Sequence, residues 1–322
     1  MTNFSVIDVG QKAVQKELID ILQQNLIFYK TAKISPLSKG SNSKTAVFRQ
    51  WAKQVLATTA LTEGTVPSGH SMTMNNVTAV VAQYGDFTQI TDLAEFLYDR
   101  SMIKDASEVL AIQAQETIDT LIVNVIGAGT NVVYGDGSVS SRVTVTTAMK
   151  LTSTLLTRAV RFLERNNVKK FSNVPTIGGG YAVASHPDVF ADIRADTNFI
   201  NAVNYSAPTP NNPNRGDLFT GELGYWMGAR LIATTIAPVW SGAGASGQAI
   251  YGTLCYGLGA YGVTELAGGL STYIHSGGNQ DTSNPLEQFS TVGWKWAGAA
   301  AILDNLRLVR LETSATYSAA TA

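Results

Sequence analysis

The amino-acid sequence predicts an α+β protein in which extended, strand-rich segments surround a few helices. Residues 46–59 and 71–91 are rich in Val, Thr, Phe and Trp, and parts of both alternate between apolar and polar side chains, as half-buried strands do. Residues 102–126 instead repeat their apolar side chains at a spacing near 3.6, which indicates an amphipathic helix. The regular strand–helix alternation of a doubly wound sheet is absent from the sequence.

The composition favours a protein that works within an assembly. Of the 322 residues, 15% are charged, against about 25% in ordinary domains, and a surface with few charges suits burial against other subunits. The 23 basic and 24 acidic residues give a net charge of −1, so no global basic excess marks a nucleic-acid binder. The length predicts about two domains.

The same inventory bears on compartment and membrane contact. Cys255 is the only cysteine, which excludes an intramolecular disulfide and a thiolate zinc cluster. No apolar run reaches the ~18 residues of a membrane span, and residues 1–8 do not resemble a secretory signal. We therefore expect no membrane partner and synthesis in a cytoplasm.

An amphipathic helix is predicted over residues 11–29, and its neighbours in sequence offer nothing to cover it. Pro36 and Gly40 end regular structure shortly after it. One stripe of the helix carries its apolar side chains: Val14, Leu18, Ile21, Leu22 and Leu26. We expect this stripe to dock on a distant surface, such as another subunit.

The strands at 46–59 and 71–91 predict a long two-stranded arm. The segment between them includes residues 62–70 (TEGTVPSGH), whose glycines and proline favour turns. An isolated hairpin is only marginally stable in water. The arm therefore needs another surface to lie on.

A long helix and a mixed second half follow the arm. Ser101 can cap the helix at 102–126, and Gly127 can end it; its length is roughly 38 Å at 1.5 Å per residue. The later elements predicted from the sequence are helices at 147–166 and 187–194, strands at 181–185, 229–236, 248–256, 261–266, 291–303 and 306–312, and polar segments at 204–216, 275–285 and 313–322.

Two segments match the G-x-G-x-x-G pattern, residues 242–247 and 257–262. In a dinucleotide site this pattern follows a strand and opens a helix, whose amides meet the pyrophosphate. Both segments here precede strand-type sequence, and neither has the acidic residue expected about 20 positions later. We predict that both are turns.

Other residues that invite a chemical interpretation are His70, His186, His275, Cys255, Trp294 and Trp296. The histidines lack the spacing of metal ligands, and we expect His186 to cap a helix or pack while the other two lie in exposed loops. The cysteine falls in an apolar strand, and the tryptophans share one strand face without the interleaved basic residues of a base-stacking surface. We predict packing roles for them, no cofactor, no metal and no enzymatic activity.

The order of these elements, together with several short segments, carries a resemblance to a known family. The segments are 61–64, 80–87 and 90–94 (LTEG, VVAQYGDF, ITDLA), 163–168 and 181–189 (LERNNV, YAVASHPDV), and 261–266, 281–287 and 291–295 (YGVTEL, DTSNPLE, TVGWK). Over residues 40–312 the chain resembles the major capsid proteins of tailed bacteriophages, which share the Johnson fold. Among these it is most similar to the N-four-like podovirus family.

The resemblance implies a division into four parts. Residues 1–40 would be an N-terminal arm, and residues 41–91 an extended β-hairpin loop. Residues 92–145 and 289–322 would form a peripheral domain whose long spine helix spans 102–126. Residues 146–288 would form an axial domain that lines the capsomer centre.

The resemblance also implies a function: self-assembly of pentamers and hexamers into an icosahedral virion shell around a double-stranded DNA genome. The implied partners are a portal, a possible scaffold, decoration proteins and the packaged DNA, which a chain of net charge −1 would contact weakly; synthesis would take place in the bacterial host cytoplasm. We expect the arm around residues 63–70 to lie over a neighbouring subunit's spine helix. The expected assembly contacts are Glu63, Gly64, Val66, Pro67, His70, Leu18, Leu22 and Trp51.

Two alternatives remain open on sequence alone. One is an encapsulin-like nanocompartment shell on the same fold, for which co-purifying cargo protein would argue. The other is an enzyme that binds a nucleotide at its glycine loops, for which nucleotide-dependent stabilisation would argue, because a ligand that binds only the folded state raises its stability.

Overall fold

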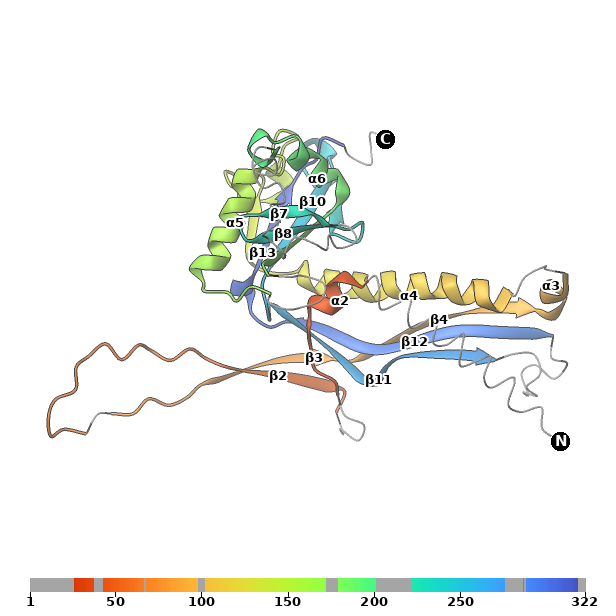
Figure 1. Cartoon of the computed structure of the whole chain (residues 1–322), viewed down its shortest axis with the longest axis horizontal. Coiled ribbons are helices and arrows are strands. Elements are labelled where there is room, and N and C mark those ends of the chain that lie inside the picture. The colour runs from red at the N-terminus through yellow and green to blue at the C-terminus, as the bar shows by residue number, and fades with distance from the viewer. Residues whose placement is uncertain are drawn as a thin grey trace, which may run out of the picture.

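A computed structural model describes residues 26–37, 43–66, 68–97, 102–171, 179–200, 222–275, 286 and 288–317. It contains a long layer, a compact body above it and a projecting hairpin (Figure 1). The elements in chain order are α2 (Ile27–Thr31), β1 (Lys33–Ile34), β2 (Thr45–Trp51), β3 (Met74–Val80), β4 (Ala82–Thr91), α3 (Asp92–Leu97), α4 (Met102–Ile126), β5 (Val132–Tyr134), η1 (Arg142–Thr144), α5 (Ser153–Arg165), β6 (Tyr181–Ser185), α6 (Pro187–Arg194), β7 (Glu222–Trp226), β8 (Ala229–Ala233), β9 (Val239–Trp240), η3 (Ala245–Gly247), β10 (Ile250–Tyr256), β11 (Tyr261–His275), β12 (Phe289–Ile302), η4 (Asn305–Arg307) and β13 (Leu308–Thr313).

The long layer is a four-stranded sheet beneath helix α4, with strand order β1-β11-β12-β4. Strand β12 pairs antiparallel with β4 over ten residue pairs, from Phe289↔Thr91 to Gly298↔Ala82. The predicted second strand of the arm, 71–91, is therefore two strands: β3 belongs to the hairpin and β4 to this sheet. The boundary between β3 and β4 could not be predicted from the sequence, because the chain stays extended through Val81, whose amide donates to the Lys44 carbonyl.

Helix α4 occupies the predicted range, 102–126, and Gly127 ends it by donating to the Val123 carbonyl. The helix is long and apolar enough to cross a membrane by length and composition. Its buried face, however, packs in the same apolar cluster as Trp294 and Trp296 of β12. This is the environment of a core helix, and both tryptophans have the packing role that the sequence predicted.

The compact body is built on a seven-stranded sheet of order β5-β13-β10-β6-β8-β7, with β9 also paired to β10. Helices α5 and α6 share a cluster with one face of this sheet. The opposite face, including Leu254 and Tyr256 of β10, joins the cluster that contains α4. The body and the long layer therefore share a continuous apolar core.

The two sheets do not follow the boundaries predicted for the peripheral and axial domains. Strands β5 and β13, from the ranges 92–145 and 289–322, pair within the seven-stranded sheet. Strand β11, from the range 146–288, pairs with β12 in the long sheet. The chain thus crosses between the two units three times: from α4 to β5, from β10 to β11 and from β12 to β13.

Several other element bounds differ from the prediction. The helix expected at 147–166 begins at Ser153, because the Thr152 side chain caps it by accepting from the Leu155 amide. Strand β11 runs to His275 rather than ending at 266, since its distal half pairs with β12 beyond a bulge. Of the predicted helix 11–29, residues 11–25 lie outside the described part of the chain, as do the segments 204–216 and 276–285.

A buried ion cluster ties the long layer to the compact body. Glu312 on β13 is fully buried and accepts from Arg142 at 2.6 and 2.7 Å and from Arg310 at 2.7 Å. Arg310 also donates to the Gly127 carbonyl at the end of α4. The Arg142 guanidinium lies 3.7 Å from the ring centroid of Trp240. One carboxylate therefore fixes both cations at the place where the spine helix meets the sheet.

A second buried carboxylate anchors the segment that precedes β1. Asp119, in the middle of α4, accepts from the amides of Ile27, Phe28 and Tyr29 at 3.0 to 3.4 Å. Asp119 thus caps α2 although the two are about 90 positions apart in sequence. Burial raises the pKa of Asp119 from 3.8 to about 6, against the opposing effect of the amide donors.

We expect Glu312→Gln to destabilise the chain by about 3 kcal/mol, because the change leaves buried cationic groups without their carboxylate. Urea unfolding followed by circular dichroism measures the loss. The matched control is Glu164→Gln, which removes a carboxylate from an exposed pair with Lys170 and should cost less than about 1 kcal/mol. Equal losses in the two variants would contradict a structural role for the cluster.

The raised pKa of Asp119 predicts a pH dependence of stability. Because the folded chain holds this proton more tightly than the unfolded chain, the contribution is full below about pH 4 and is lost as the pH rises through about 6. Asp119→Asn removes the titrating group and keeps one acceptor oxygen. As the pH is lowered from about 7 to about 4, the free energy of unfolding of wild type should therefore rise relative to that of the variant. A difference that stays constant across that range would refute the assignment.

Candidate assembly surfaces

The hairpin of β2 and β3 has one face on the body of the protein and one face outward. The strands pair antiparallel from Thr45↔Val80 to Trp51↔Met74. Phe48 and Ala79 are buried in a small cluster with Ala301 of β12, which fixes the base of the hairpin. Side chains alternate along a strand, so Val47, Arg49 and Trp51 point outward and are exposed.

Beyond Trp51 the chain forms a long loop with no surface to lie on. From Lys53 to Thr73 every described residue is exposed. Among the described residues, one backbone bond joins the two sides of this loop, from the Ala52 amide to the Thr73 carbonyl. At the tip the Thr65 amide bonds to the Thr62 carbonyl, with Gly64 at φ +80°, the conformation that a turn of this kind requires of its third residue.

The loop is nevertheless rich in large apolar side chains. Val66 is 97% exposed, and its exposed apolar companions are Val55, Leu56, Leu61 and Met72. A concentration of exposed large apolar side chains within one segment is typical of an interaction site. The charged residues just before, on and just after β2 are basic: Lys44, Arg49 and Lys53.

A second exposed surface lies on helix α4 at the opposite end of the molecule (Figure 1). Val109 is 67% exposed and Ile112 is 50% exposed. Exposed acidic residues accompany them at helical spacing: Asp105, Glu108 and Glu116. We call this set the spine face. Near it, β4 and α3 expose further apolar side chains: Phe87, Leu93, Phe96 and Leu97.

The predicted assembly residues divide into two groups. Trp51, 59% exposed, ends β2, and the loop beyond it carries four more, all exposed: Glu63, Gly64, Val66 and His70. Leu18, Leu22 and Pro67 lie outside the described residues. The apolar loop residues such as Leu56 and the exposed positions of α4 were not among the predicted assembly residues. The sequence signal for them is an apolar side chain that stands within a turn-rich or an acidic segment.

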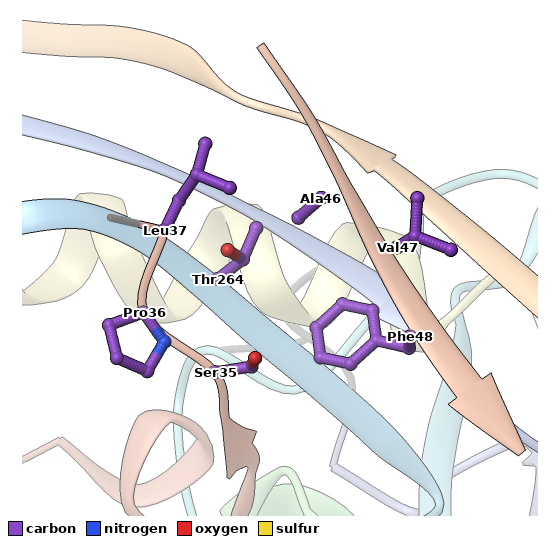
Figure 2. Close-up of a pocket in the computed structure, with 7 residues that line it drawn as sticks. All are labelled: Ser35, Pro36, Leu37, Ala46, Val47, Phe48 and Thr264. Carbon is purple, nitrogen blue, oxygen red and sulfur yellow. The ribbon is translucent and has the colours of Figure 1, made fainter. Parts of the chain in front are cut away.

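A small cavity sits where the hairpin crosses the long sheet (Figure 2). It has a volume of about 90 Å³ and is lined by Ser35, Pro36, Leu37, Ala46, Val47, Phe48 and Thr264. The Thr264 hydroxyl is buried and has no hydrogen-bond partner among the described residues. Sites for organic ligands occupy roughly 300–1,000 Å³. The cavity is therefore a packing gap beneath the hairpin on the scale of a few water molecules.

The sequence segments that suggested chemistry have structural roles. Residues 242–247 form a loop that ends in the short helix η3, and residues 257–262 turn from β10 into β11, so both predicted turns are confirmed. His186 caps α6 by accepting from the Asp188 amide. Burial raises the pKa of the Cys255 thiol to about 12, which leaves it protonated and unreactive at neutral pH.

Metal ligands do not gather in the part of the chain that the structure describes. Within it, no group of three or more His, Cys, Asp or Glu side chains is placed to hold a metal ion.

Comparisons with known proteins place the chain among shell-forming proteins. A family model described as phage capsid protein matches residues 75–309. The capsid of Ralstonia phage GP4 superposes with a TM-score of 0.66 at 14% identity, covering 90% of this chain and 91% of its own. The capsid of cyanophage P-SCSP1u gives 0.65 at 16% identity, covering 91% and 89%.

A cellular shell has a related fold. The holo-SrpI encapsulin complex from Synechococcus elongatus superposes with a TM-score of 0.53 at 12% identity, covering 89% of this chain and 87% of its own. No curated protein sequence matches the chain. The structural likenesses confirm the predicted capsid fold, and the family match extends across both sheets.

Proposed function

The chain belongs to the phage capsid protein family, and on that premise we propose how it assembles: the hairpin loop of one copy lies on the spine face of another. The family match over residues 75–309, nearly three quarters of the chain, carries the function. The chain is a major capsid protein, the repeated subunit of a phage shell. Its family is a structural one, and we propose that it has no catalytic role.

Two kinds of complementarity support this docking. The loop offers apolar side chains such as Leu56 and Val66 to the exposed Val109 and Ile112 of α4, and the burial of such side chains drives association. The hairpin is basic where the spine face is acidic. Opposite charges at the rim of an interface steer the encounter and fix its register.

The geometry requires that the two surfaces belong to different copies. The hairpin and α4 project to opposite sides of the molecule (Figure 1), and the base of the hairpin is held on β12 by Phe48. Contact between a loop at one end and a helix at the other is heterologous. Contacts of this type close into rings when the rotation between copies allows it, which suits pentamers and hexamers.

Other roles are proposed from the resemblance. We propose the division that the resemblance implies: residues 1–40 as an N-terminal arm, 41–91 as an extended loop, 92–145 with 289–322 as a peripheral domain, and 146–288 as an axial domain at the capsomer centre. Portal, scaffold and decoration proteins and the packaged duplex DNA are the proposed partners, with synthesis in the bacterial host cytoplasm. Within the family we propose an affinity with the N-four-like podovirus capsid proteins, on the segments that run from residue 61 to residue 295.

Deletion of residues 64–71 should abolish shell formation and leave the subunit folded. The deleted residues that the structure describes are all exposed, so their removal takes away the contact without opening the core. Electron microscopy of wild type and variant measures assembly, and circular dichroism serves as the folding control. Normal shells from the deletion variant would sink the proposed docking.

Charge reversal should test the partner surface directly. Arg49→Glu with Lys53→Glu, or Glu108→Lys with Glu116→Lys, should each reduce shell yield at least tenfold, because like charges then face each other across the contact. The chain with all four changes restores the attraction and should recover assembly, which controls for misfolding of either pair. The docking is wrong if the fourfold variant assembles no better than the two double variants.

A further inference from the structure

Helix α5 and the turn after it carry a concentration of positive charge that shell contacts between hairpin and spine do not use. Five basic residues and one acidic residue lie between positions 153 and 170, in a chain whose net charge is −1. We define the basic stripe as Arg158, Arg161, Arg165 and Lys169. All four are exposed, while the opposite side of the helix is buried against the seven-stranded sheet.

Most of this charge is not neutralised within the subunit. The acidic residue in the segment, Glu164, pairs with Lys170 at 3.2 Å and leaves the stripe itself alone. No carboxylate of the described residues lies within 4.0 Å of Arg161, Arg165 or Lys169. Arg158, Arg161 and Arg165 are three or four residues apart on α5, so their side chains are neighbours along one side of the helix, over roughly 10 Å. Lys169 follows in the segment just after the helix.

The stripe differs chemically from the surfaces that bind other copies. No large apolar side chain is exposed on α5, whereas the hairpin loop and the spine face expose several. The core of a protein interface is apolar and depleted of lysine. Arginine and lysine side chains that have no carboxylate partner are instead typical of surfaces that contact nucleic-acid phosphates and position a duplex without reading its sequence.

We propose that the basic stripe binds the phosphate backbone of duplex DNA. This inference rests on the proposed function, because a shell that encloses a genome presents its inner side to DNA, and it assigns the outer side of α5 to that inner surface. Binding is independent of sequence and weakens with salt, since each neutralised phosphate releases condensed counterions. The low net charge of the chain is therefore compatible with a local DNA site.

The test compares two triple variants of the full-length chain, purified as free subunits. Arg161→Gln, Arg165→Gln and Lys169→Gln remove the stripe, and Lys33→Gln, Arg194→Gln and Lys295→Gln remove the same charge from exposed positions on β1, α6 and β12. Fluorescence anisotropy with a random-sequence DNA duplex is recorded over a salt series. The stripe variant should lose roughly hundredfold in affinity at about 0.1 M salt, and its salt slope should fall by about 2.7.

The control triple variant should lose far less, and Arg161→Lys with Arg165→Lys, which keeps the charge, should retain most of the binding. Equal losses in the stripe and control variants would overturn the inference. So would equally tight binding of poly-glutamate, or a stripe variant that binds DNA normally but no longer assembles, because both results indicate an acidic protein surface as the partner. Shell formation by wild type, scored separately by microscopy, tests the capsid function independently.

Discussion

Among the described residues, no surface of the same chain covers the outward side chains of the hairpin, and this constraint shapes the rest of the subunit. Phe48 holds the base of the hairpin on β12 while the loop extends away from the body. Exposed apolar area is costly in water, so the loop reaches its lowest free energy only against another molecule. In the proposed docking, the complementary surface lies on α4 at the far end of the molecule, so that each copy both gives and receives one contact.

Helix α4 holds its position through buried polar contacts as well as apolar packing. Asp119 joins α4 to the segment that leads into β1, and Glu312 joins the end of α4 to β13. Each carboxylate is satisfied by several donors, which offsets the cost of its burial. A projecting segment needs a rigidly held base, because a contact made at its tip transmits force to the subunit only through that base.

Local patterns predicted much of this architecture. The 3.6 spacing of apolar residues fixed the range of α4, and the apolar run at 181–185 and the proline at 187 predicted β6 and α6. Pairing between distant segments was beyond such reasoning: nothing local in residues 82–91 distinguishes a strand of the arm from a partner of β12. Helix caps show the same difference between local and distant contacts. Thr152 adjoins the helix that it caps, whereas Asp119 is about 90 residues away from the amides that it binds. The turn and exposure of residues 63–70 could be predicted, but the acidic and apolar pattern of the spine face was hidden within a helix that otherwise has the pattern of core sequence.

The three connections between the long layer and the compact body, from α4 to β5, from β10 to β11 and from β12 to β13, lie close together. The turn between β10 and β11 bonds there to the passage between β12 and β13, through the Ala260 carbonyl and the amides of Leu303 and Asp304, and Arg310 reaches the end of α4. A load applied to either unit is consequently divided among three covalent paths in parallel, and tension cannot peel one unit from the other by stretching a single linker. Together with the shared apolar core, these parallel paths resist separation of the two units, as a closed shell under internal pressure requires of each of its subunits.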